Sequence, residues 1–126
     1  MKHITTEQAP AAIGPYSQAV EASGFLFVSG QLGLDPANGE LASSEITGQT
    51  EQTIKNLENI LKAAGSSLDR VVKTTVYLAR LEDFPAMNGV YSRYFTGKPA
   101  RATVVVSALP RQALVEIECV ALTREG

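Results

Sequence analysis

The chain has 126 residues, 44% hydrophobic and 19% charged, and this composition predicts one globular domain, residues 1–126, that buries a core without disulfides. The formal net charge of −2, with lysines and arginines scattered, makes nucleic acid or an anionic membrane an improbable partner. A single cysteine excludes an internal disulfide, and residues 1–15 lack the apolar run of a signal peptide, so we expect a cytoplasmic protein.

The first third of the chain favours short strands and turns. Two prolines and a glycine interrupt residues 10–16, and the pair Ser23-Gly24 is typical of a hairpin turn. We expect strands over residues 2–6, 17–22 and 25–29, a loop over residues 10–16 and a turn-rich connection over residues 30–41.

Two helices are predicted from apolar side chains that recur every three or four residues. The first runs from about Glu45 to Ala64 and ends at Gly65, in the usual left-handed cap position. The second runs from about Phe84 to Phe95, with Asp83 as its N-terminal cap. Between the helices, residues 71–79 are rich in valine and threonine and predict a strand.

The last two predicted strands carry opposite charges in the most apolar part of the chain. Residues 99–106 predict a buried strand that opens on Arg101, and residues 114–122 a strand that carries Glu116 and Glu118. Side chains alternate along a strand, so the two carboxylates share one face and Cys119 lies on the other, core-facing one. Charges among such neighbours are either paired or wait for a ligand, which suggests a site for a small anionic molecule.

The order of these elements is an α+β pattern. Two helices cover only one face of a sheet of five or six strands. Along residues 71–78, Val72, Thr74, Val76 and Leu78 alternate with Val71, Lys73, Thr75 and Tyr77, and both sets are largely apolar. We therefore expect the second face of the sheet to be buried against another subunit of a homo-oligomer.

Five groups of residues, in the same order along the whole chain, resemble the RidA family of reactive intermediate deaminases, also called the YjgF family. They are APAAIGPYSQ at 9–18, SGQ at 29–31, VKTTVY at 72–77, MNGVY at 87–91 with YF at 94–95, and PAR at 99–101 followed by LP at 109–110 and VEIE at 115–118. The resemblance implies a chorismate-mutase-like fold, with a five- to six-stranded mixed sheet and two helices on one face. It also implies a homotrimer with a central barrel and active-site clefts between subunits.

The resemblance further implies hydrolysis of short-lived enamines and imines, such as 2-aminoacrylate and 2-iminopropanoate, to a 2-keto acid and ammonia, with neither cofactor nor metal. Arg101 matches the arginine that binds the substrate carboxylate, a role that suits its forked guanidinium. Glu116 matches the glutamate that orients or activates the attacking water. Residues that match the lining of the cleft are Tyr16, Ser29, Gly30 and Asn88.

Thr103 departs from the family pattern, because many deaminases of the family have cysteine two residues after the arginine. Thr103 shares the face of Arg101 and still offers a hydroxyl to the substrate site. Glu118 remains an alternative to Glu116, since a simple hairpin of the last two strands would place Glu118 nearer to Arg101.

Two other classes of function stay open. The same trimer could sense 2-keto acids or amino acids, or bind a protein, without turnover. An endoribonuclease activity is also attached to this family, but the negative charge and the lack of a basic stripe argue against it. His3 is the only histidine and lies near the terminus, where a catalytic or metal-binding role is improbable.

Overall fold

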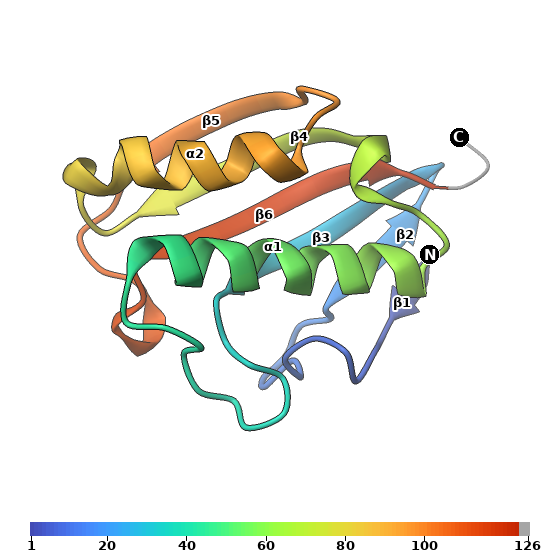
Figure 1. Ribbon diagram of the computed structural model, residues 1–126. Coiled ribbons are helices and arrows are strands. Elements are labelled where there is room, and N and C mark those ends of the chain that lie inside the picture. Colours follow the sequence, from blue (N-terminus) through green and yellow to red (C-terminus); the bar gives the residue numbers. More distant parts are fainter. Residues whose placement is uncertain (124–126) are drawn as a thin grey trace.

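Two α-helices pack side by side on one face of a six-stranded mixed sheet in the computed structural model, which describes residues 1–123 (Figure 1). The strands are β1 (Lys2–Ile4), β2 (Ala19–Ala22), β3 (Phe25–Leu32), β4 (Val71–Leu78), β5 (Ala100–Val105) and β6 (Val115–Leu122). The helices are α1 (Ile46–Ala63) and α2 (Phe84–Tyr94), with short 3₁₀ turns at Leu68–Arg70, Leu81–Asp83 and Pro110–Gln112. The predicted α+β class is confirmed.

The strand order is β1-β2-β3-β6-β4-β5, and every neighbouring pair is antiparallel except β4 and β5. Parallel strands need a long crossover, and α2 supplies it between β4 and β5. The simple hairpin considered for the last two strands is therefore wrong, because β4 lies between β5 and β6. This order decides how far apart the charged residues of the two strands lie.

The predicted turn between β2 and β3 is confirmed. Ser23 and Gly24 have φ angles of 53° and 84°, and Ala22 pairs with Phe25 across the turn. Positive φ at both central residues is the requirement of a type I′ turn, whose twist matches the two flanking strands.

Helix α1 has the predicted buried stripe and the predicted end. Gly65 adopts φ +78°, its N–H donates to the Lys62 carbonyl at 2.9 Å, and the Ser66 N–H donates to the Leu61 carbonyl at 2.8 Å. This pair of hydrogen bonds is a Schellman cap, which satisfies carbonyls that the last helical turn leaves free.

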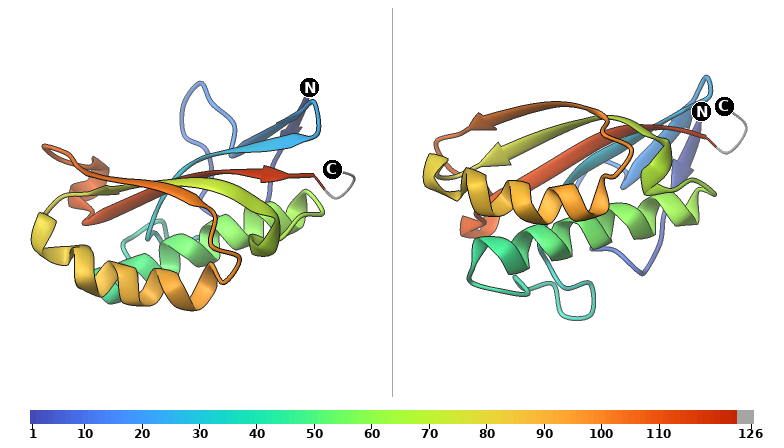
Figure 2. Two further views of the ribbon diagram at one scale, coloured as in Figure 1. Left: turned by 90° about the horizontal axis from the view of Figure 1, so that it is seen from above. Right: turned by 45° about the horizontal axis from the view of Figure 1, so that its top comes forward.

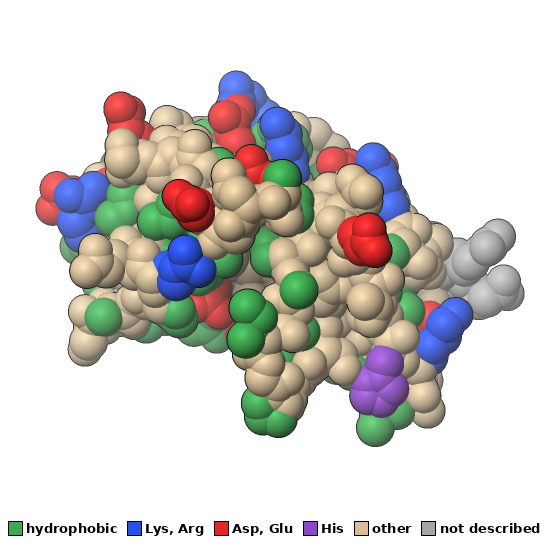
Figure 3. All heavy atoms as spheres, turned by 90° about the horizontal axis from the view of Figure 1, so that it is seen from below, with side chains coloured by type: hydrophobic (Ala, Val, Ile, Leu, Met, Phe, Trp, Pro, Cys, Tyr) green, Lys and Arg blue, Asp and Glu red, His purple; other side chains and the backbone are tan. Residues whose placement is uncertain are grey.

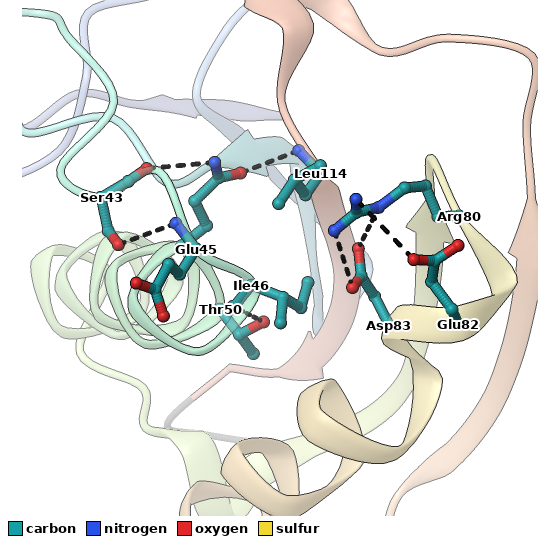
Figure 4. Close-up of polar contacts among 9 residues, drawn as sticks. Ser43, Glu45, Ile46, Thr50, Arg80, Glu82, Asp83 and Leu114 are labelled. Atoms are coloured by element: carbon teal, nitrogen blue, oxygen red, sulfur yellow. Dashed lines mark hydrogen bonds and ion pairs between the residues drawn. The ribbon is translucent and has the colours of Figure 1, made fainter.

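Two buried amides on α1, which the apolar pattern did not predict, tie the helix to the sheet and its loops. The Asn56 side chain donates to the carbonyls of Leu32 and Leu34, at 3.0 and 2.9 Å. Gln49 accepts from the Leu114 N–H at 2.8 Å and donates to the Ser43 carbonyl at 3.1 Å (Figure 4). Helix α1 therefore holds both the end of β3 with the segment that follows it and the segment that leads into β6.

The start of α2 differs from the prediction. The Asp83 carboxylate makes no capping hydrogen bond and instead accepts two from the Arg80 guanidinium, both at 3.0 Å (Figure 4). Asp83 already lies within a 3₁₀ turn, with φ −84° and ψ −5°, so its backbone lacks the extended conformation typical of a capping residue.

Strand β4 has a register shift between Val71 and Lys73, which changes the predicted alternation at one position. Val71 is buried with Thr74, Val76 and Leu78, whereas Val72 is exposed. The prediction that Val72 shares the face of Thr74 is wrong, because a bulge adds one residue before the regular pairing begins.

Both helices lie on the same side of the sheet, and among the described residues, 1–123, no helix covers the opposite side, which we call the open face (Figure 2). The open face carries Phe25, Phe27, Tyr77, Val104, Glu116 and Glu118. Phe27 is 49% exposed and Val104 is 44% exposed. Strand β5, predicted as buried, is largely exposed, because it is an edge strand with β4 as its one neighbour. Within residues 1–123, no helix has both the length and the apolar character needed to span a bilayer.

Asn56 provides a test of this architecture. Asn56→Leu leaves the Leu32 and Leu34 carbonyls without their donor, and we expect a loss of about 1–3 kcal/mol in the free energy of unfolding. Chemical denaturation measures it. The matched control is Asn59→Leu on the same helix, where the Asn59 amide donates to the Gln8 carbonyl in an exposed position that water can replace. Equal losses in the two variants would contradict the anchoring role of Asn56.

Candidate functional site

Arg101 lies on the helix-covered face of β5, opposite Thr74 of β4. Its guanidinium carbon lies 4.8 Å from the centre of the Tyr91 ring and 5.6 Å from the centre of the Phe84 ring. Its Nη1 donates to the Asn88 Oδ1 at 2.7 Å. Residues 84, 88 and 91 recur at helical spacing along one side of α2, so a single helix face supports the guanidinium.

The guanidinium keeps one edge available. The Arg101 Nη1 is hydrogen-bonded to Asn88. Within residues 1–123, no hydrogen bond joins Nε or Nη2 of Arg101 to another residue. The side chain is exposed and borders a cavity of about 400 Å³, which Pro99 and Phe95 also line. Two parallel N–H groups on one edge match the two oxygens of a carboxylate.

Thr103 lies two residues after Arg101 on the same face, opposite Val76. Its Oγ1 is the one buried side-chain oxygen or nitrogen within residues 1–123 that has no hydrogen-bond partner. Arg101, Asn88 and Thr103 thus lie on one side of the sheet, and we call these three residues the arginine group.

Glu116 lies on the open face, opposite Leu32 of β3 and Tyr77 of β4. A register shift in β3 between Val28 and Gln31 brings Gly30 against the Glu116 carboxylate. A methyl group at Gly30 would overlap that carboxylate and would lie 2.9 Å from its Cδ. Position 30 therefore has to be glycine for the carboxylate to stay where it is.

Ser29 and Tyr16 lie beside Gly30. The Ser29 hydroxyl donates to the Ser17 carbonyl at 2.6 Å. The Tyr16 side chain is 54% exposed and lines a cavity of about 730 Å³ together with Ser29 and His3. We call Tyr16, Ser29, Gly30 and Glu116 the glutamate group.

The loop that carries Tyr16 is held by Gln18, a residue that the sequence analysis did not single out. The Gln18 side chain is buried, accepts from the Thr6 N–H at 2.7 Å and donates to the carbonyl of Pro10 at 2.8 Å. Gln18 lies near the start of the strand predicted over residues 17–22, and a polar residue there gave no signal that would have marked it as buried.

Burial and charge both act on Glu116. Partial burial raises the pKa of its carboxyl above the ordinary glutamate value, and the nearby Glu118 carboxylate raises it further. Glu118 is more exposed and accepts a hydrogen bond from the Tyr77 hydroxyl at 2.8 Å, which raises the pKa of Tyr77. Glu116 thus holds a proton more readily than an ordinary glutamate does.

Cys119 faces the core, as predicted. Burial, with a smaller contribution from Glu118, raises the pKa of its thiol to about 12, so it stays protonated at neutral pH. The His3 ring is hydrogen-bonded to the Ser17 hydroxyl, with 2.7 Å between Nδ1 and Oγ. Within residues 1–123, no three histidine, cysteine, aspartate or glutamate side chains converge as ligands of a metal ion would.

The arginine group and the glutamate group do not meet within one chain. Arg101 and Glu116 lie on opposite faces of the sheet, and β4 separates their strands by roughly 10 Å, two inter-strand spacings. The candidate site residues therefore form two separate groups, one beside α2 and one beside the β3 bulge.

These features define a small α+β protein with a guanidinium held beside a cavity and, elsewhere, a partly buried carboxylate. The family model described as Endoribonuclease L-PSP matches residues 6–123. A RutC family protein of Pyrococcus horikoshii is 52% identical over 119 residues, 94% of each chain. The 2-iminobutanoate/2-iminopropanoate deaminase of Mus musculus is 52% identical over 122 residues, which are 96% of this chain and 90% of that protein. The chain therefore belongs to the RidA family, also called YjgF.

Solved structures agree with this assignment. The YjgF gene product of E. coli is similar with a TM-score of 0.93 and 40% sequence identity, over 98% of this chain and 100% of that one. The structure of E. coli TdcF, which holds bound serine, has a TM-score of 0.93 and 36% identity, over 97% of this chain and 98% of that one.

The charge of Glu118 gives a testable effect on Glu116. Both causes of the raised pKa disfavour the charged carboxylate, so removing the negative charge of Glu118 lowers the pKa of Glu116. NMR titration of the side-chain carboxyl carbon in Glu118→Gln measures the shift. Glu51→Gln, on α1, is the control and leaves the titration unchanged. A pKa that stays the same or rises in Glu118→Gln would contradict the coupling.

Proposed function

We propose that this protein hydrolyses 2-imino acids and their enamine tautomers, such as 2-iminopropanoate and 2-aminoacrylate, to the 2-keto acid and ammonia. The observation that carries the proposal is the Arg101 guanidinium, which α2 holds in place and which borders a cavity. Relatives at about half identity that are named 2-iminobutanoate/2-iminopropanoate deaminase support the reaction, and the serine bound to TdcF supports a small ligand that bears a carboxylate.

The complete site is shared between copies of the chain. In the proposed homotrimer, of the chorismate-mutase-like type, the open faces form a central barrel. The arginine group of one copy meets the glutamate group of the next. The separation of Arg101 from Glu116 within one chain supports this arrangement, as do the exposed phenylalanines of the open face, Phe25 and Phe27.

Arg101 holds the substrate in this mechanism. Its open edge forms two parallel hydrogen bonds with the carboxylate and offsets its charge. Asn88 and the two aromatic rings keep the guanidinium in place before the substrate arrives, so little ordering is needed on binding. Thr103 lies two residues after the arginine on the same face of β5, in place of the family cysteine.

Glu116 guides the water. Its carboxylate takes a proton from water as the oxygen attacks the carbon of the protonated imine, and the C=N electron pair moves to nitrogen to give a neutral carbinolamine. The protonated Glu116 then returns the proton to nitrogen. Ammonia leaves with the C–N electron pair as the carbonyl forms, and the hydroxyl proton passes to the Glu116 carboxylate, which releases it to solvent. A raised pKa suits a group that both takes and returns a proton near neutral pH.

The reaction needs no cofactor, because a protonated imine is already a strong electrophile and positioning supplies the remainder. The proposed location is the cytoplasm, where enzymes that use pyridoxal phosphate release such imines. A binding protein for 2-keto acids or amino acids without turnover is the second candidate, favoured by Thr103 and by the serine bound to TdcF.

RNA cleavage, which the description of the family model names, is less well supported by this chain. The net charge is −2, and the face drawn in Figure 3 carries both signs interspersed rather than a stripe of one sign. A surface that follows a phosphate backbone needs a cluster of lysines and arginines.

Arg101→Ala tests the proposed activity. The variant loses the group that holds the substrate carboxylate, and we expect a loss of about 2–5 kcal/mol in transition-state binding, a fall in kcat/KM of roughly 30-fold or more. The assay generates 2-aminoacrylate with a serine dehydratase and follows release of the keto acid. Arg93→Ala is the control, because Arg93 lies on α2 and pairs with Glu51 at the surface.

Glu116→Gln and Glu118→Gln in the same assay identify the carboxylate that guides water. We expect the loss of activity in Glu116→Gln.

If the wild-type protein does not accelerate the release of keto acid but binds keto acid measurably, the result would contradict the enzymatic function and support the binding function instead. Unchanged kinetics in Arg101→Ala would reject the role of the arginine.

A further inference from the structure

We infer that Tyr91 is a positioning residue for Arg101: its ring, fixed by a buried hydrogen bond to Thr74, holds the guanidinium in the orientation that receives the carboxylate. The inference rests on the proposed function, and it assigns a role to a residue that makes no direct contact with the substrate in that mechanism.

The ring of Tyr91 is the nearer of the two aromatic faces beside Arg101. The guanidinium carbon lies 4.8 Å from its centre, within the range at which a cation is attracted to an aromatic face. The tyrosine is only 7% exposed, so its own position is fixed by packing, while the arginine is exposed. A fixed ring beneath a mobile cation restricts the cation rather than the reverse.

The orientation of the ring has a specific cause. The Tyr91 hydroxyl and the Thr74 Oγ1 lie 2.7 Å apart in a buried position, and Thr74 is 0% exposed. Thr74 is the direct register partner of Arg101 in the parallel pair of β4 and β5. The ring is therefore fastened to the strand position beside the arginine that it supports.

A second contact fixes the other side of the tyrosine. The Phe95 ring lies 4.4 Å from the Tyr91 ring, centre to centre. Tyr91 is thus held by its hydroxyl at one end and by an aromatic neighbour along its side. Filling the core does not by itself require a hydroxyl at this position, since phenylalanine has the same ring.

The expected effect is on binding. A contact that is the same in the bound substrate and in the transition state changes KM and leaves kcat nearly unchanged. Loss of the aromatic face in Tyr91→Leu should raise the Kd for pyruvate, the keto-acid product, by about 3- to 30-fold. Tyr91→Phe keeps the ring but loses its hydrogen bond to Thr74, so it should raise Kd by less than Tyr91→Leu does and by about as much as Thr74→Val does.

Isothermal titration with pyruvate and the dehydratase-coupled assay measure these effects on the full chain. Tyr94→Leu is the matched control, because Tyr94 lies on α2, is partly buried and makes no ring contact with Arg101. Should Tyr91→Leu fail to fold, Phe84→Leu removes the other ring, 5.6 Å from the guanidinium carbon, and should also raise Kd.

The Thr74 hydrogen bond is tested by a double-mutant cycle. Thr74→Val should raise the Kd for pyruvate when Tyr91 is present and have no effect in a Tyr91→Phe background, because the hydroxyl that it fixes is then absent. A loss of stability without this dependence would mark the pair as structural only and overturn its positioning role.

The outcomes separate the inference from the proposed function. If Arg101→Ala abolishes pyruvate binding and Tyr91→Leu leaves Kd unchanged, or raises it no more than Tyr94→Leu does, Tyr91 has no positioning role although the arginine binds the carboxylate. If Arg101→Ala leaves pyruvate binding unchanged, both the carboxylate role of Arg101 and the role of Tyr91 are rejected.

Discussion

The position of β4 between β5 and β6 is the constraint on which the rest of the account depends. It places the Arg101 guanidinium and the Glu116 carboxylate on opposite faces of one sheet, two inter-strand spacings apart. Within one copy, the two groups face away from each other and are not arranged around a common ligand. In the shared site that we propose, a second copy joins them through the edge strand β5 and the open face.

Much of the fold could be predicted because its signals are local. The stripe of α1, the left-handed Gly65 after it and the Ser23-Gly24 turn each depend on a few neighbouring residues. The pairing of β5 with β4 depends instead on a crossover through α2, so the sequence could not distinguish it from a hairpin with β6. The buried amides of Gln49 and Asn56 were missed for a related reason, since their partners lie far away along the chain.

The candidate site, too, could be predicted only in part from the sequence. Alternation along β6 correctly placed Glu116 and Glu118 together and Cys119 on the core side. Family resemblance supplied Asn88 and Gly30, and the structure gives each a physical contact, with the Arg101 guanidinium and the Glu116 carboxylate respectively. The aromatic support from Phe84 and Tyr91 could not be predicted, because an apolar stripe on α2 is equally well explained by core packing.

Mixing of inactive subunits tests the shared site most directly. Arg101→Ala and Glu116→Gln chains, unfolded and refolded together in equal amounts, should regain activity, because roughly a quarter of the interfaces then join an intact arginine to an intact glutamate. As a control, the chain with both substitutions is refolded with the wild type, which should also give about a quarter of the wild-type activity. A mixture of the two single variants that stays inactive, with about half the wild-type activity in the control, would show that each copy works alone and would contradict the account.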